Sequence, residues 1–373
     1  MNKRLVQATA IASAAVLGVT ACGGGVVVTP TGGTGRAAQS SYSCPEGQLV
    51  GGGATSQKLA IDTLISDYAR ECGGKATIEY SGTGSGAGIK DFYNAQIDWA
   101  GSDSALRTTP NSDQIVEAGK AAERCGGPAW NLPLVIGPVA FAYNLDEVNK
   151  LTLTPAVIGD IAFGRITRWD DPAIASLNPG VALPDLAISV FFRSDESGTT
   201  ENMTEFLKAA APGNFTAETS KKWPGTVGEG KKGTQGVAEG VAATRGGFGY
   251  MEWKFATDNR LGVAAIDNGA GPVALTPETV AKGVEGARVS GEGHDLSLDL
   301  AYSGTAAGAY PAIMVSYEVV CSTGLDAAKT ALMKDFLSFM ASADEQEALV
   351  DKGYGPLPEA LRTKVTQAIE AIR

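Results

Sequence analysis

The sequence predicts an α/β fold, in which strands and helices alternate along the chain. Short apolar runs rich in β-branched and aromatic residues, such as 187–192, are each followed by a stretch with helical periodicity. Turns rich in glycine or hydroxyl side chains separate the two kinds of stretch. The 373 residues, 44% of them hydrophobic, suffice for one large domain or two of medium size.

The first 21 residues have the pattern of an export signal. Lys3 and Arg4 form a basic start, residues 5–20 are mostly apolar, and small residues precede Cys22. This site resembles the cleavage site of bacterial lipoproteins, so we expect Cys22 to become the lipidated first residue. The alternative is an ordinary signal peptide with Cys22 as a spare thiol. A spanning helix is disfavoured because the apolar run is short and no stop-transfer charges follow it.

Residues 22–43 are rich in Gly, Thr, Ser and Ala, which predicts a flexible tether between a lipid anchor and the folded part. The formal charge of the chain is −11, and loss of Lys3 and Arg4 with the leader changes it to −13 (−11 − 2). An acidic body of this kind repels nucleic acid. Affinity for an anion must therefore come from a local, desolvated site.

Four cysteines follow Cys22, and an even number outside the cell predicts disulfides. Cys44 lies just before the first predicted strand, and Cys72 lies just after the first predicted helix. A helix that runs back along its strand places these two ends together, so we pair Cys44 with Cys72. Elimination then pairs Cys125 with Cys321.

The first half of the chain predicts regular βα units. The expected elements are a strand at 48–52, a helix at 57–70, a strand at 76–80, a short helix through Phe92, and a strand at 97–101. The first helix has a buried stripe of Ile61, Leu64, Ile65 and Tyr68. The apolar run 131–144 is broken by Pro133 and Pro138.

Residues 193–201 are the turn between a predicted buried strand at 187–192 and a predicted helix at 202–211. Free backbone N–H groups and the positive end of the helix dipole favour an anion at a helix start. Arg193 adds a planar donor fork that suits a tetrahedral oxyanion. The alternative is an ordinary capped helix beside an exposed arginine.

Two other strand-to-helix turns offer the same chemistry. Because ligands bind outside the carboxyl ends of strands in open α/β sheets, all three turns should meet at one edge. The hydroxyl and backbone donors of these turns come from Thr55, Ser56, Ser85, Ser197, Gly198 and Thr199. Together with Arg193 they predict a cradle for a tetrahedral oxyanion.

Other kinds of site fit the sequence less well. The turn at 82–88 fits only a degenerate dinucleotide fingerprint, and it lacks the Gly-Lys-Ser/Thr of a Walker A loop. Thr83 occupies a glycine position of the nucleophile pattern around Ser85. The sole histidine, His294, lies in a polar loop, which disfavours a Ser-His-Asp triad and a site with several histidines. We therefore predict no catalytic residue, metal or cofactor.

The mature chain resembles the phosphate-binding proteins of the bacterial high-affinity phosphate ABC importer, and more closely the lipoprotein form of actinobacteria-like Gram-positives. The resemblance rests on the order and spacing of stretches at 53–55, 82–88, 101–104, 163–172, 193–200, 247–252 and 353–358. It implies a two-lobed periplasmic-binding-protein fold of type II, with a ligand cleft between the lobes and a two-segment hinge. Lobe 1 would comprise 44–131 and 288–373, and lobe 2 would comprise 132–287.

The resemblance also implies a set of ligand positions. These are Thr55, Ser56, Ser85, Asp103, Arg193, Ser197, Gly198 and Thr199. Ser56 stands where many members have an aromatic residue, which predicts a contact through its backbone N–H. Glu196 stands where the commonest form has glycine, so its carboxylate must point away from the anion.

Asp103 is expected to discriminate between anions. Phosphate near neutral pH keeps at least one proton, which a carboxylate can accept, whereas sulfate presents only lone pairs. A buried polar group that the wrong ligand leaves unpaired can favour the right ligand by a factor of roughly 10⁴–10⁵. The alternative is an N-cap or surface aspartate.

The predicted function is a binding module without catalysis. It would capture inorganic phosphate and deliver it to a two-subunit permease with cytoplasmic ATPases, as a lipid-anchored monomer on the extracytoplasmic face of the cell membrane. One alternative is a secreted phosphoesterase with a Ser or Thr nucleophile. Another is the same fold with sulfate, molybdate or a phosphonate as ligand.

Overall fold

The computed structural model describes residues 41–110, 114–303 and 306–373. The predicted signal peptide at 1–21, the lipidation site Cys22 and the tether as far as residue 40 lie outside these residues. In the described part of the chain, no helix is both long and apolar enough to cross a membrane.

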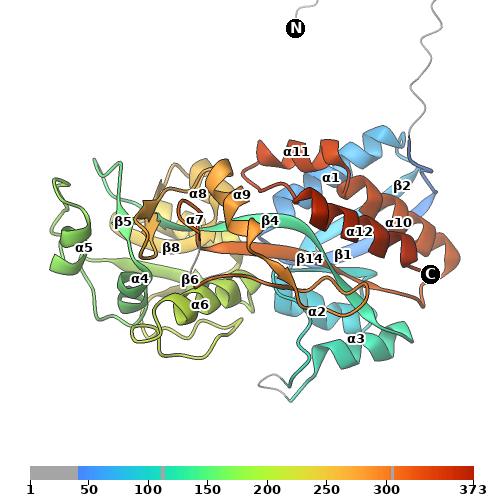
Figure 1. Cartoon of the computed structure of the whole chain (residues 1–373), viewed down its shortest axis with the longest axis horizontal. Helices are drawn as coiled ribbons and strands as arrows, with labels where there is room; N and C mark the ends of the chain where they lie inside the picture. The colour runs from blue at the N-terminus through green and yellow to red at the C-terminus, as the bar shows by residue number, and fades with distance from the viewer. Residues whose placement is uncertain (1–40, 111–113, 304–305) are drawn as a thin grey trace, which may run out of the picture. The chain divides into compact units, whose positions relative to one another are not determined.

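The described residues form an α/β structure around a nine-stranded sheet (Figure 1), which confirms the predicted fold class. Strand β9 (Gly262–Val263) pairs with β4 beside the main path. In spatial order the other strands are β2 (Ala76–Gly82), β1 (Gly47–Gly53), β3 (Trp99–Ser102), β14 (Ile313–Cys321), β4 (Ala129–Tyr143), β8 (Gly247–Glu252), β6 (Ser189–Arg193) and β7 (Glu229–Lys231).

Helices cover both ends of this sheet (Figure 1). Beside β1–β3 are α1 (Lys58–Glu71), α2 (Ser85–Tyr93), α3 (Glu117–Cys125), α10 (Ala327–Met340), α11 (Ala343–Val350) and α12 (Glu359–Ala371). The others are α4 (Pro155–Ala162), α5 (Pro172–Leu177), α6 (Gly198–Ala210), α7 (Gly233–Ala243), α8 (Trp253–Asp258) and α9 (Pro277–Glu285). Two small sheets consist of β5 (Thr152–Leu153), β10 (Ala265–Asp267) and β11 (Pro272–Val273), and of β12 (Arg288–Val289) and β13 (Leu298–Asp299).

The first strands and helices follow the predicted βα pattern. β1 pairs in parallel with both β2 and β3, so the carboxyl ends of all three strands lie at one edge. In α1, Ile61, Leu64 and Tyr68 are buried as their spacing predicts, and Ile65 is partly buried. Parallel strands with helices packed on them therefore position the first two turns of the predicted cradle.

Strand β4 is continuous through both prolines that break the apolar run 131–144. Its first part, as far as Pro138, pairs with β14, and from Val139 onward it pairs with β8. Pro138 therefore lies where β4 changes partner, and Pro133 lies where the β4–β14 register shifts, opposite Tyr317. Proline lacks a backbone N–H, so it is tolerated where the ladder of hydrogen bonds is already irregular.

The strands β6, β7 and β8 run parallel to one another at the other end of the sheet. Helix α6 begins at Gly198, four residues before the predicted start at 202. The reason is the N-cap residue Ser197, whose Oγ accepts a hydrogen bond from the backbone N–H of Thr200 at 3.2 Å. The predicted hydroxyl-rich turn is thus largely the first turn of the helix.

Both predicted disulfides are confirmed. Cys44 is bonded to Cys72, and Cys125 is bonded to Cys321, with the two Cα atoms 5.3 Å apart in each pair. The first bond joins the segment before β1 to the end of α1, and the second joins the end of α3 to the end of β14.

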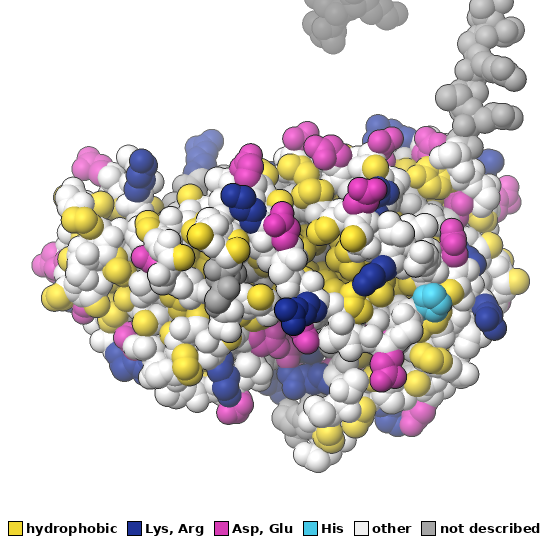
Figure 2. Space-filling model, in the orientation of Figure 1, with side chains coloured by type: hydrophobic (Ala, Val, Ile, Leu, Met, Phe, Trp, Pro, Cys, Tyr) yellow, Lys and Arg dark blue, Asp and Glu magenta, His cyan; other side chains and the backbone are white. Residues whose placement is uncertain are grey.

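Acidic and basic side chains are interspersed on the face of the molecule shown in Figure 2, with hydrophobic side chains between them. This face carries no continuous field of a single sign, in keeping with a negatively charged chain that contains 30 basic and 41 acidic residues.

Candidate functional site

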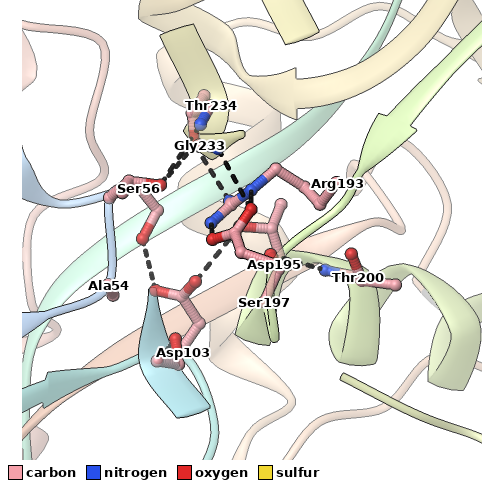
Figure 3. A network of polar contacts seen from close by, with 12 residues as sticks. Ala54, Ser56, Asp103, Arg193, Asp195, Ser197, Thr200, Gly233 and Thr234 are labelled. Atoms are coloured by element: carbon pink, nitrogen blue, oxygen red, sulfur yellow. Dashed lines mark hydrogen bonds and ion pairs between the residues drawn. The ribbon is translucent and has the colours of Figure 1, made fainter. Parts of the chain in front are cut away.

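The three predicted turns meet at the carboxyl ends of β1, β2, β3 and β6. All the predicted ligand residues belong to one polar cluster there, and most of their side chains are buried. Figure 3 shows Ser56, Asp103, Arg193 and Ser197 of this cluster. We call it the Asp103 cluster; it comprises Thr55, Ser56, Ser85, Asp103, Arg193, Asp195, Ser197, Gly198, Thr199, Thr234, Glu252 and Ser316.

Asp103 lies at the centre of this cluster and is 2% exposed. Its Oδ1 accepts hydrogen bonds from Ser56 Oγ at 2.5 Å and from Ser316 Oγ at 2.6 Å. Its Oδ2 lies 3.1 Å from Thr199 Oγ1. Burial raises the pKa of Asp103, while these hydroxyls and the charge of Arg193 oppose that shift. The hydroxyl groups of Ser56 and Ser316 both donate to Oδ1, which makes this oxygen a hydrogen-bond acceptor.

Arg193 is also 2% exposed and is held by Asp195, which the sequence analysis did not single out. Its Nε and Nη2 donate to the two carboxylate oxygens of Asp195 at 2.8 and 2.5 Å, and its Nη1 donates to Thr234 Oγ1 at 3.2 Å (Figure 3). Burial lowers the pKa of Arg193, but the hydrogen bonds and charge of Asp195 outweigh this and raise it. The guanidinium is thus charged and fixed in direction.

The spacing of Arg193 and Asp195 was the available signal for this pair. Arg193 is the last residue of β6 and Asp195 follows it by two, a spacing at which the side chains of an extended segment project to the same side. Asp195 Oδ1 also accepts a hydrogen bond from the backbone N–H of Gly233 at 3.0 Å, which no local pattern predicts. Burial raises the pKa of Asp195, but the hydrogen bonds and charge of Arg193 prevail and lower it.

The first turn contacts both ends of the sheet. Thr55 Oγ1 lies 3.0 Å from Thr234 Oγ1 and accepts a hydrogen bond from the Thr234 backbone N–H at 3.2 Å. The hydroxyl group of Ser56 donates to Asp103. The expected contact of the Ser56 backbone N–H with an anion stays a prediction.

The second turn and the start of α6 touch each other across the cluster. Ser85 Oγ accepts a hydrogen bond from the Asp103 backbone N–H at 3.2 Å. A Cβ on Gly198 would lie 2.6 Å from Asp103 Cβ and 2.7 Å from Ser85 Oγ. Only glycine permits this approach, because real Cβ atoms do not come so close to other heavy atoms.

Glu196 turns its carboxylate toward two lysines. Its Oε2 lies 2.8 Å from Lys90 Nζ and its Oε1 lies 3.3 Å from Lys222 Nζ. Burial raises the pKa of Glu196, but its hydrogen bonds with Lys90 and Lys222 prevail and lower it. This placement agrees with the expectation that the charge of Glu196 is directed away from an anion in the cluster.

Two further buried acids were missed by the sequence analysis. Glu252, at the end of β8, is 1% exposed, and its Oε1 lies 2.9 Å from Thr199 Oγ1. Glu318, on β14, is fully buried and accepts a hydrogen bond from Gln57 Nε2 at 3.3 Å. Burial raises the pKa of Glu252 to about 7, and it raises the pKa of Glu318 well above its ordinary value. The sequence gives no local sign that these carboxyl groups are buried.

His294, the sole histidine, does not belong to the Asp103 cluster. The ring of His294 packs on Trp130, with centroids 5.0 Å apart, and His294 makes no hydrogen bond within the Asp103 cluster. The described cluster therefore combines a guanidinium that Asp195 holds in place, the buried carboxyl groups of Asp103 and Glu252, and several hydroxyl groups. This combination can bind a protonated tetrahedral oxyanion by hydrogen bonds and charge.

Comparison with known proteins places the chain in a family. A model of the periplasmic-binding-protein (PBP) superfamily domain matches residues 34–344. The phosphate-binding protein PstS2 of Mycobacterium bovis is 39% identical over 369 residues, which are 98% of each chain. The chain belongs to the family of bacterial phosphate-binding proteins. A more distant member of this family, from Xylella fastidiosa, is 33% identical over 84% of this chain and 82% of its own length.

Solved structures share the fold of this family member. A high-affinity periplasmic phosphate-binding protein solved with phosphate has a TM-score of 0.70 and 23% identity, and the match covers 86% of this chain and 93% of that one. A phosphate ABC transporter substrate-binding protein of Clostridium perfringens gives a TM-score of 0.60 at 17% identity, covering 83% and 100%. These matches establish the two-lobed α/β fold of periplasmic binding proteins.

Proposed function

We propose that this protein captures inorganic phosphate in the Asp103 cluster and delivers it to an ABC permease. The observation that carries the proposal is the pairing of a buried acceptor, Asp103, with a fixed guanidinium, Arg193, among hydroxyl donors. The phosphate-binding names of its relatives at 38–39% identity support the same ligand.

Each predicted ligand has a distinct role in this proposal. Arg193 supplies the compensating positive charge, and Asp103 accepts the proton that phosphate retains near neutral pH. The hydroxyl groups and backbone N–H groups donate to the other phosphate oxygens; they belong to Thr55, Ser56, Ser85, Ser197, Gly198 and Thr199. Sulfate carries no proton for Asp103, so the same site rejects it.

The proposed lobes are residues 44–131 with 288–373, and residues 132–287. Under this division Thr55, Ser85 and Asp103 lie in lobe 1, whereas Arg193 and 197–199 lie in lobe 2. The hydrogen bond between Thr199 and Asp103 then crosses the cleft, as does the contact of Thr55 with Thr234. Opening about the two chain segments that join the lobes, at 131–132 and 287–288, would separate these groups and admit the anion, as a hinge motion.

The proposed setting is the extracytoplasmic face of the cell membrane. Cys22 carries the lipid anchor, residues 22–43 form the tether, and the monomer delivers phosphate to permease subunits with cytoplasmic ATPases. The lipoprotein-like leader and the family membership support this setting.

Calorimetric titration of the mature protein, stripped of bound anion, tests the proposal. We expect one phosphate to bind per chain and sulfate to give no heat. The absence of phosphate heat would contradict the proposal. Release of phosphate from ester substrates in a parallel assay would instead favour the phosphoesterase alternative.

A further inference from the structure

The hydroxyl group of Thr199 lies between two buried carboxyl groups. Thr199 Oγ1 is 2.9 Å from Glu252 Oε1 and 3.1 Å from Asp103 Oδ2. A hydroxyl group has one hydrogen and can donate to only one of the two oxygens. If both acids were ionised, one carboxylate oxygen would face a lone pair of Thr199 at hydrogen-bond distance. At least one of the two acids must therefore carry a proton.

The hydrogen bonds of the two acids decide which one carries it. Asp103 Oδ1 accepts from Ser56 and from Ser316, and Arg193 supplies a favourable charge. Glu252 has only Thr199 as a side-chain partner, and its Oε2 is buried without a hydrogen-bond partner among the described residues. A buried, unpaired carboxylate is costly, whereas a neutral carboxyl group has an O–H to donate.

The charges around Glu252 favour its neutral form as well. On β8 it lies opposite Val139 of β4 and close to the first turn of α6. The charged and titratable groups that act on it are Asp103 after β3, Arg193 on β6, and Tyr354 in the segment between α11 and α12. Burial and the charge of Asp103 raise the pKa of Glu252 to about 7, and Arg193 opposes them only in part.

We propose that Glu252 is a positioning residue of the phosphate site. Its carboxyl group carries a proton and donates a hydrogen bond to Thr199 Oγ1. The Thr199 hydrogen is then directed to an oxygen of the bound anion, while Asp103 remains free to accept the proton of phosphate. The result is a chain of hydrogen bonds from Glu252 through Thr199 to phosphate, in which each bond polarises the next. This inference rests on the proposed phosphate-binding function.

The proposal makes phosphate affinity depend on the charge of Glu252. When Glu252 loses its proton, Thr199 must donate to Glu252 instead of to the anion, and a second negative charge adjoins the site. If only the protonated form binds, the apparent dissociation constant rises about tenfold for each pH unit above the pKa of Glu252. The affinity should therefore fall as pH rises.

The test compares Glu252→Gln with the wild-type protein by phosphate titration calorimetry across pH. Both proteins meet the same mixture of phosphate ions at each pH, so the titration of phosphate itself cancels in the ratio of their dissociation constants. We expect the ratio of wild type to Glu252→Gln to be near one at about pH 5.5 and roughly ten at about pH 8. A ratio that does not change with pH overturns the proposal.

Two other variants make this test specific. Glu205→Gln is the matched control, because Glu205 also has a pKa raised by burial to about 7 but makes no hydrogen bond within the Asp103 cluster. It should keep the wild-type pH profile, and a flattened profile in this variant would overturn the proposal. Glu252→Met cannot ionise or donate, so it should lose the pH dependence and bind roughly three- to tenfold more weakly at about pH 5.5.

Glu252→Met also serves if Glu252→Gln does not fold, which circular dichroism of each variant would reveal. A Glu252→Met protein with a wild-type pH profile would contradict the proposal. Failure of the proposed function would give a different result, because none of the proteins would then bind phosphate at any pH.

Discussion

The carboxylate of Asp103 is held by hydroxyl groups from three separate parts of the chain. Ser56 follows β1, Thr199 lies in the first turn of α6, and Ser316 lies on β14. Because Ser56 and Ser316 both donate to Oδ1, the carboxylate of Asp103 is held in place and cannot rotate away from an anion that lacks a proton. This rigidity is what a site needs to exclude a ligand that is the same size as phosphate and differs only in a hydrogen atom.

Asp103→Asn should weaken discrimination between phosphate and sulfate. The amide keeps the shape of the side chain, but its NH₂ group can donate to a sulfate oxygen, and the variant lacks the negative charge that repels sulfate. We expect the selectivity of roughly 10⁴–10⁵ to fall by most of that range. Competition of sulfate with labelled phosphate measures the change. Sulfate rejection as strong as in the wild type would show that Asp103 does not select the anion.

The sequence analysis named most of the Asp103 cluster but missed Asp195, Thr234, Glu252 and Ser316. Strand-to-helix turns reveal hydroxyl groups and Arg193 because each turn is local in sequence. Ser316 and Glu252 lie on strands whose apolar patterns indicate burial but not what each side chain faces. Their positions depend on the order of strands in the sheet, which local patterns do not determine.

The start of α6 packs directly on the segments that follow β2 and β3. Gly198 lies at this contact, against Asp103 and Ser85. The hydroxyl-rich segment is therefore both part of the anion site and the surface on which the two ends of the sheet meet.

Gly198→Ala should weaken phosphate binding without unfolding the protein. The added methyl group would lie 2.6 Å from Asp103 Cβ, so the contact could form only with strain. Overpacking of this kind costs roughly 1–3 kcal/mol, which corresponds to about a 5- to 150-fold rise in the dissociation constant. Calorimetry measures the affinity, and thermal unfolding checks the fold.

Gly213→Ala is the control for this variant, because a Cβ at Gly213 meets no atom within 4 Å and this glycine has no positive φ. It should bind phosphate as the wild type does. Equal affinities for the two alanine variants would show that the contact at Gly198 is not needed for binding.

Two ion-pair groups flank the Asp103 cluster and differ in burial. Lys221, whose side chain is 8% exposed, lies between Glu117 on α3 and Glu201 on α6, at 3.6 and 3.1 Å. The pair of Lys90 on α2 with Glu196 is far more open, and the Lys90 side chain is 40% exposed. Breaking a buried pair leaves an uncompensated charge, whereas an exposed pair contributes little.

Lys221→Met should therefore affect phosphate binding more than Lys90→Met. We expect the loss of Lys221 to raise the dissociation constant about tenfold or more, because Glu117 would lose its ion pair and repel Glu201, which keeps Arg107. For Lys90→Met the rise should stay below about fivefold, since an exposed pair contributes at most about 1 kcal/mol. An equal effect of the two variants would mean that burial does not decide the strength of these contacts.

The elements themselves were largely predictable, and the differences have local causes. Ser197 caps α6 and starts it earlier than its apolar pattern indicated. Pro133 and Pro138 break the apolar run 131–144, but β4 continues through both because each lies where its pairing changes. Whether a proline is tolerated in a strand depends on the pairing with neighbouring strands, which one segment alone does not reveal.

At the scale of the whole molecule, the two disulfides constrain very different lengths of chain. Their cysteines are separated by 28 residues in the Cys44–Cys72 bond and by 196 residues in the Cys125–Cys321 bond. In the chain-entropy model, a longer closed loop removes more entropy from the unfolded state.

The double variant Cys125→Ser/Cys321→Ser should thus lose more stability than Cys44→Ser/Cys72→Ser. The chain-entropy model predicts a difference of about 1.7 kcal/mol in the free energy of unfolding. Urea denaturation of both variants under the same conditions measures it. If the Cys44–Cys72 variant were the less stable one, loop length would not be the dominant contribution.

The place of β14 in the sheet has a consequence for how the protein is made. Strands β1 to β3 leave the ribosome first, yet β3 has β14 as its neighbour, more than half the chain later. The early strands keep one edge unpaired until residues 103–312 have followed them and β14 arrives. The Cys125–Cys321 bond can form only after that, so its appearance in a pulse-labelled culture would time the completion of the sheet.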